Sequence, residues 1–124
     1  MVKTKIDDEK SFEFFLKNGI LATMRNYHYR VGGIVGIKQN SVIVTYGKIL
    51  AVLENNETFQ RILLKYSSFN DIHEWKKRAK ELHGKLPRYI VIVKRIRLNQ
   101  AERYKDQNIA FLNSERKANG NEII

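Results

Sequence analysis

Hydrophobic residues recur at helical spacing in two parts of the chain. Residues 9–18 have this pattern, with Ser11 as a candidate N-cap and Gly19 as a stop. Residues 71–83 have it more regularly, and Gly84 follows them where a helix is expected to end. We therefore predict a helix in each of these segments.

Extended segments lie between and after these helices. Residues 20–25, 41–53 and 88–98 carry the apolar and β-branched residues of strands. Residues 54–69 satisfy both patterns, and we favour a helix there. Gly47 interrupts the longest strand, and an isolated glycine in a strand is typical of a bulge or bend.

Turn signals complete the order of elements. Gly32 and Gly33 mark a turn before apolar residues resume, and Gln39-Asn40 is a candidate hairpin turn. The first half of the segment 88–98 is apolar on both faces, which predicts a central place in the sheet. About five or six strands with two or three helices between them indicate an α+β fold built on a mostly antiparallel β-barrel.

Length and composition indicate one globular domain in the cytoplasm. The 124 residues, 43% of them hydrophobic, are enough for one core. We expect that domain in residues 1–99, and a polar extension in residues 100–124 that is partly disordered or adds one element. The chain has no cysteine, which excludes disulfides and thiolate metal sites. We expect neither a signal peptide nor a membrane span, because no long apolar run occurs.

The net charge of +10 is unevenly distributed. Residues 20–53 carry four basic residues, residues 85–100 carry five, and neither segment has an acidic residue. Nine of the ten excess charges therefore lie in two acid-free segments. This distribution favours a polyanionic partner, and a basic composition that serves solubility alone is the other interpretation.

The most distinctive segment for binding is RNYHYR, residues 25–30, in which two arginines flank two tyrosines and a histidine. Arginine binds phosphate, and aromatic rings stack on unpaired bases. We therefore predict a nucleic-acid site, with RNA as the expected ligand and DNA as the alternative. In the other interpretation the tyrosines pack one end of the barrel and the arginines are solvated. The candidate binding residues are Arg25, Tyr27, His28, Tyr29, Arg30, Tyr46, Lys48, Arg88, Lys94, Arg95 and Arg97.

Signals for catalysis are weak. His28, His73 and His83 show no metal-ligand spacing, and no glycine-rich loop matches a phosphate-binding motif. Glu54 and Glu57 are close enough in sequence to pair, but nothing marks them as catalytic. We expect no metal and no cofactor.

Residues 18–25, NGILATMR, resemble the ASCH family of the PUA-like superfamily. Its pattern is Gly-x-Lys-x-x-Thr/Glu-x-Arg, followed by a Val-Gly-Asp-like segment. Thr23 and Arg25 fill the last two motif positions, and Val31-Gly32-Gly33 resembles the second segment with glycine in place of the aspartate. The order of elements also agrees over about residues 10–98. The resemblance implies a PUA-like barrel that binds nucleic acid, with Thr23 as a further binding residue.

The chain departs from this pattern where the chemistry of the family matters. Asn18 stands at the glycine position and Ile20 at the lysine position. Some ASCH relatives are amidohydrolases acting on acetylated cytidine, or ribonucleases, and their motif lysine and threonine belong to the active site. Isoleucine cannot activate a nucleophile, which weighs against catalysis. Two alternatives stay open: a nucleoside or RNA hydrolase using Thr23 with Glu54 or Glu57, and a module that binds an acidic protein or assists transcription.

Overall fold

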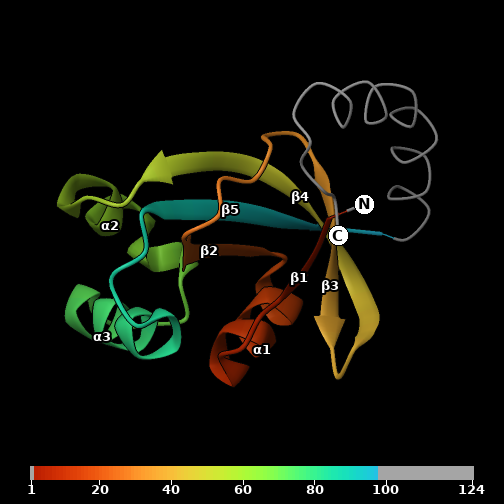
Figure 1. Ribbon diagram of the computed structural model, residues 1–124, viewed down its shortest axis with the longest axis horizontal. Helices are drawn as coiled ribbons and strands as arrows, with labels where there is room; N and C mark the ends of the chain where they lie inside the picture. The colour runs from red at the N-terminus through yellow and green to blue at the C-terminus, as the bar shows by residue number, and fades with distance from the viewer. Residues whose placement is uncertain (1, 98–124) are drawn as a thin grey trace.

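Five strands and three α-helices follow one another in the computed structural model, which describes residues 2–97 (Figure 1). In chain order the elements are β1 (Val2–Lys5), α1 (Glu9–Asn18), β2 (Ile20–Arg25), β3 (Ile34–Gln39), β4 (Val42–Glu54), α2 (Glu57–Leu63), a 3-10 turn (Leu64–Tyr66), α3 (Ile72–His83) and β5 (Tyr89–Ile96). The helix favoured in the ambiguous segment 54–69 is confirmed. The extension expected at residues 100–124 lies outside the described residues.

The strands form one sheet in the order β1-β3-β4-β5-β2, and every neighbouring pair is antiparallel except β1 with β3. The sheet curls into a half-barrel, with β1 and β2 as its two edges (Figure 1). Asn40 and Ser41, with φ of 51° and 68°, make the hairpin turn between β3 and β4, one residue beyond the predicted turn. The α+β class and the mostly antiparallel architecture are therefore confirmed.

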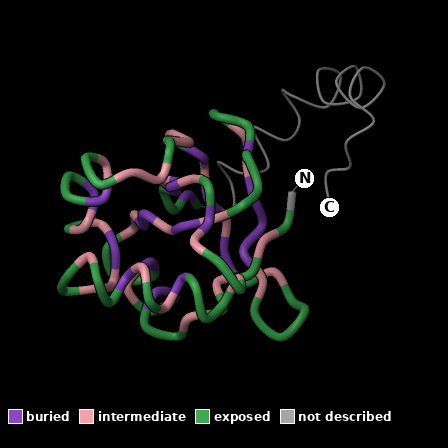
Figure 2. The backbone as a smooth tube through the Cα atoms, turned by 60° about the vertical axis from the view of Figure 1, so that its left-hand side comes forward, coloured by how far each residue is buried: buried purple, intermediate pink, exposed green. Residues whose placement is uncertain are grey.

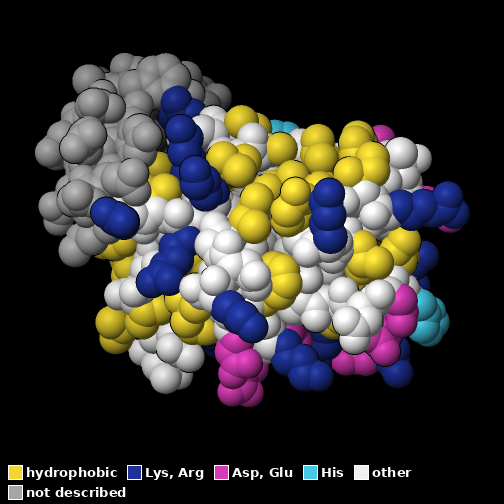
Figure 3. All heavy atoms as spheres, turned by 180° about the vertical axis from the view of Figure 1, so that it is seen from behind, with side chains coloured by type: hydrophobic (Ala, Val, Ile, Leu, Met, Phe, Trp, Pro, Cys, Tyr) yellow, Lys and Arg dark blue, Asp and Glu magenta, His cyan; other side chains and the backbone are white. Residues whose placement is uncertain are grey.

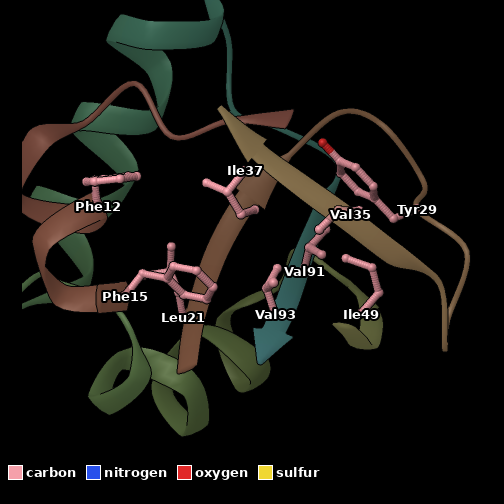
Figure 4. Close-up of a cluster of buried hydrophobic side chains, with 9 residues drawn as sticks. All are labelled: Phe12, Phe15, Leu21, Tyr29, Val35, Ile37, Ile49, Val91 and Val93. Atoms are coloured by element: carbon pink, nitrogen blue, oxygen red, sulfur yellow. The ribbon is translucent and has the colours of Figure 1, made fainter. Parts of the chain in front are cut away.

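Both faces of the half-barrel are covered by helices. On the inner face, Phe12 and Phe15 of α1 pack with Leu21, Val91 and other strand residues, and Figure 4 shows these side chains converging. On the outer face, α2 and α3 cover a second cluster that contains Trp75, Met24 and Ile90. Consecutive residues of a strand point to opposite faces, so β5 needs apolar residues in succession. Its predicted central place is confirmed, and Figure 2 shows the buried residues gathered in strands and on helix faces.

Local signals account for the ends of the helices. Asp8, rather than the predicted Ser11, is the N-cap of α1, because its carboxylate accepts a hydrogen bond from the Ser11 amide at 2.9 Å. Asp71 caps α3 in the same way. Gly19 and Gly84 end α1 and α3 with φ of 74° and 81°, a left-handed conformation that favours glycine. No helix within residues 2–97 has both the length and the apolar character to cross a membrane.

Gly47 serves close packing rather than a bulge. It is paired regularly with both neighbouring strands, and the register shifts of β4 instead leave Val44 and Leu50 as the extra residues. A Cβ atom at position 47 would lie 2.4 Å from Cγ1 of Val93 and 3.4 Å from Cγ2 of Val35. The predicted bulge at Gly47 is therefore wrong, and glycine is needed because β3, β4 and β5 leave no space for a methyl group there.

Candidate nucleic-acid interface

The predicted binding residues divide between the two ends of the curled sheet. At one end, where β2 stops and β5 starts, Arg25 is paired with Tyr89. At the other end Lys48 of β4 is directly opposite Lys94 of β5. Lys94 lies five positions after Tyr89 along the extended strand β5, which corresponds to a distance of about 17 Å. The predicted binding residues therefore form two separate surfaces.

At the first end, the loop after β2 and the start of β5 are joined directly. The backbone amide of Arg88 donates a hydrogen bond to the side-chain oxygen of Asn26 at 3.2 Å. The ring of His28 packs edge-on against Tyr89 at 5.0 Å, and the Arg88 guanidinium lies 5.5 Å from the centre of the same ring. Tyr27 is 46% exposed. We call Tyr27, His28, Arg88 and Tyr89 the aromatic end.

Tyr89 is the member of the aromatic end that sequence reasoning missed as a site residue. It is the first residue of β5, and its neighbour Arg88 was already a candidate. The signal was the arginine-tyrosine pair at the start of an otherwise apolar strand. Only the contact with His28, which is 61 positions earlier, shows that the pair belongs to the site.

Tyr29 has a structural role. Its ring is 8% exposed and belongs to the inner core, at the side away from α1 (Figure 4). Its hydroxyl group is hydrogen-bonded to Oγ1 of Thr4 at 2.8 Å. Tyr27 packs against it edge-on, with ring centres 4.7 Å apart. The predicted stacking on a base is therefore available to Tyr27 and not to Tyr29, which anchors the loop.

Thr23 and Arg25 lie together on the inner side of β2. Nε of Arg25 donates to Oγ1 of Thr23 at 3.3 Å, and its Nη1 donates to Oγ1 of Thr4 at 3.4 Å. Both residues line a cavity of about 40 Å³ between α1, β2 and α3. Small-molecule pockets usually measure about 300–1,000 Å³, so this cavity has room for water but not for a nucleoside.

The charges around this small cavity are mixed. Burial raises the pKa of the Asp8 carboxyl group, but hydrogen bonds from Arg78 and Ser11 outweigh burial and leave the pKa below its usual value. Burial lowers the pKa of His83, and the neighbouring Arg25 cation lowers it further. The cavity is thus lined by two carboxylates, two guanidinium groups and an imidazole whose neutral form is favoured. This combination does not favour an anion over a neutral ligand.

The carboxylates considered for a hydrolase are placed elsewhere. Glu54 ends β4 and is paired with Tyr89, and Glu57 forms an ion pair with Arg61 on α2. Neither is among the described residues that line the cavity beside Thr23. The structure therefore does not bring Thr23 and these two glutamates together. Within residues 2–97, no cluster of His, Asp and Glu has the makeup of a metal site.

At the second end of the sheet, Arg95 connects β5 to α1. Its Nε donates to Oγ1 of Thr45 at 3.1 Å, and its Nη1 donates to the carbonyl oxygen of Leu16 at 3.1 Å. Its backbone amide also donates to the carbonyl of Gly19 at 2.8 Å. A cation is favourable at the C-terminus of a helix, so Arg95 stabilises the end of α1 as well as adding positive charge.

The remaining predicted cations and Tyr46 are accessible to different degrees. Lys94, Arg30 and Arg97 are exposed, and Tyr46 and Lys48 are half-buried on the outer face of β4. Figure 3 shows one face of the molecule on which Lys and Arg side chains are spread among hydrophobic ones, while Asp and Glu side chains lie along the lower and right-hand margins. Basic side chains therefore extend well beyond the aromatic end.

Comparison of the chain with known protein families, with curated proteins and with solved structures found no match. The resemblance of residues 18–25 to the ASCH family therefore stays a prediction.

Proposed function

We propose that the protein binds single-stranded RNA through the aromatic end. The observation that carries the proposal is that the loop after β2, which exposes the ring of Tyr27, is joined to the start of β5 by the Arg88–Asn26 hydrogen bond and the His28–Tyr89 ring contact, with the Arg88 guanidinium beside Tyr89. Arg25 and Arg30 flank this loop, and Arg88 lies on its other side. Rings of this kind stack on unpaired bases while guanidinium groups bind phosphate.

The charge of the described strands as a whole supports an anionic ligand. The five described strands carry a single carboxylate, Glu54, which lies opposite Tyr89. Stacking requires bases that are not already paired, so a single strand fits the aromatic end better than a duplex. Rigid anchoring of the loop by Tyr29 also favours binding, because less side-chain freedom is lost when the ligand arrives.

The test is fluorescence anisotropy with labelled single-stranded RNA, double-stranded RNA and matched DNA, at about 50 and 200 mM salt. We expect salt-dependent binding with a preference for the single RNA strand. The strands are run on a gel afterwards, and cleaved strands would favour the hydrolase alternative. Absence of binding at the lower salt concentration would refute the proposal.

Substitutions at three positions locate the site. Tyr27→Ala is expected to weaken binding about 5- to 100-fold, as removal of a stacked ring does, whereas Tyr27→Phe keeps the ring and stays within about twofold of wild type. Arg88→Ala removes the guanidinium but not the backbone hydrogen bond to Asn26, so it weakens binding without releasing the loop. Glu54→Gln removes a nearby negative charge and is expected to strengthen binding. Equal affinities of the wild-type protein, Tyr27→Ala, Arg88→Ala and Glu54→Gln would exclude the aromatic end.

A further inference from the structure

A second basic surface lies on the outer face of the sheet, at the end away from the aromatic end. Lys3, Lys38, Lys48 and Lys94 come from β1, β3, β4 and β5 respectively. A neighbour of each along its strand points to the inner face, so alternation directs the four lysines outward. Together with Tyr46 of β4 they form what we call the lysine face: Lys3, Lys38, Lys48, Lys94 and Tyr46.

The register brings these residues into three successive rows, the last of which holds Lys38, opposite Lys5 and Ile43. Lys48 and Lys94 are directly opposite each other, and in the next row Tyr46 lies between Gly36 and Ile96. Lys3 is paired with the same Gly36. Gly36 contributes no side chain to this row. The arrangement is therefore an aromatic ring next to a pair of lysines, with a third lysine, Lys3, two strands away on β1.

The lysine face has the dimensions and the charge of a surface for a polyanion. Three strand spacings separate Lys3 from Lys94, which corresponds to about 14 Å. No carboxylate of the described strands lies here, since Glu54 is at the other end of the sheet. Lys5, the next outward residue of β1, forms an ion pair with Asp7 at 3.4 Å. An open groove lined by Tyr46, Ile96, Arg97 and neighbouring residues adjoins it.

We infer that the lysine face binds the sugar-phosphate backbone of RNA as a second contact surface, separate from the aromatic end. The inference rests on the proposed function, because it assigns a further part of the surface to the same ligand. Clustered lysines attract phosphate as point charges without reading sequence, and Tyr46 supplies one ring for a base. The helices α2 and α3 cover the outer face between the two surfaces, so each surface contacts a different segment of the ligand.

The salt dependence of RNA binding measures this contact. For single strands, the slope of log affinity against log salt changes by about 0.7 for each phosphate that is neutralised. The double variant Lys48→Gln with Lys94→Gln is therefore expected to reduce the slope by about 1.4. Tyr46→Ala is expected to weaken binding at least about fivefold, and Tyr46→Phe to leave it near wild type. Thermal unfolding of each variant establishes that the fold is retained.

A matched control is available on α3. Lys77 and Lys80 are both exposed on this helix, so Lys77→Gln with Lys80→Gln removes the same charge from a different surface. The inference predicts a reduced slope for the lysine-face variant and an unchanged slope for the α3 variant. Equal slopes for the two variants would overturn it.

The two proposals fail in different ways. If the wild-type protein binds no RNA, both are refuted. If it binds RNA, and if Tyr27→Ala weakens binding while the Lys48 and Lys94 double variant keeps the wild-type slope, only the lysine face is refuted.

Discussion

Gly47 is the position where the packing of the half-barrel leaves least room. A methyl group there would lie 2.4 Å from Cγ1 of Val93, well inside the contact distance of about 3.5–4.0 Å between two carbon atoms. Val93 and Val35 are both buried, and β4 is hydrogen-bonded to β3 and β5 on its two sides. The strands cannot move apart without losing these bonds. We therefore expect Gly47→Ala to lower the free energy of unfolding by about 2–3 kcal/mol.

A double-mutant cycle with Val93→Ala isolates this contact. Val93→Ala removes the methyl group that the new Cβ would meet, and by itself costs about 2 kcal/mol of stability. In that background Gly47→Ala is expected to cost less than about 1 kcal/mol, which gives a coupling energy of at least about 1 kcal/mol. Urea unfolding followed by the fluorescence of Trp75, the single tryptophan, measures all four proteins.

The destabilisation by Gly47→Ala has to shrink when Val93 is truncated. An equal loss in both backgrounds would refute the close approach of β4 and β5 at this point. It would attribute the effect of the substitution to the backbone conformation of residue 47 instead.

Three other predictions concern stability. Asp71→Ala removes the N-cap of α3 and is expected to lower the free energy of unfolding by about 1 kcal/mol in a urea titration, whereas Asp71→Asn, which keeps a capping oxygen, stays near wild type. Tyr29→Phe deletes the hydrogen bond to Thr4 and is expected to cost about 1 kcal/mol; no loss would show that the bond contributes nothing net. Burial raises the pKa of Asp8, but the hydrogen bond from Arg78 helps to hold it below the value of about 3.9 expected in the unfolded chain. This contribution to the free energy of unfolding is fully present above a pH of about 3.9 and is lost as the pH falls through the folded pKa. Asp8→Asn is therefore expected to be less stable than wild type at pH 7. In urea titrations at several pH values, the free energies of unfolding of the two proteins are expected to converge in acid.

The helices and the central strand were predictable because their signals are local. Helical spacing, a capping aspartate and a stop glycine are all present within 71–84, and α3 occupies Ile72–His83. Likewise the continuous apolar run of 88–98 predicted a strand with both faces covered, and β5 is that strand. The N-cap predicted at Ser11 and the bulge predicted at Gly47 were wrong. A serine near a helix start can be the cap or lie in the first turn, and a glycine in a strand can mark a bulge or allow close packing. Which role applies depends on the atoms that lie nearby in the folded chain.

The candidate site was only partly accessible to sequence reasoning. The segment 25–30 stood out by its composition, but sequence could not say that Tyr29 faces the core while Tyr27 is exposed. Nor could it show that Tyr89 joins them across 61 positions from His28. These assignments depend on where the loop crosses the sheet, which is set by the packing of the inner core.

By itself, the sequence determined which segments are helical or extended, that the basic residues avoid acidic ones over two long stretches, and which residue types are available to bind a polyanion. The tertiary structure alone decided that these cations form two surfaces about 17 Å apart along β5, with Arg95 engaged in holding α1. The physical reason is that residues alternate between two faces of a strand, whereas strand order and register determine which faces meet. Those two properties arise from contacts between residues far apart in the chain, and no local pattern encodes them.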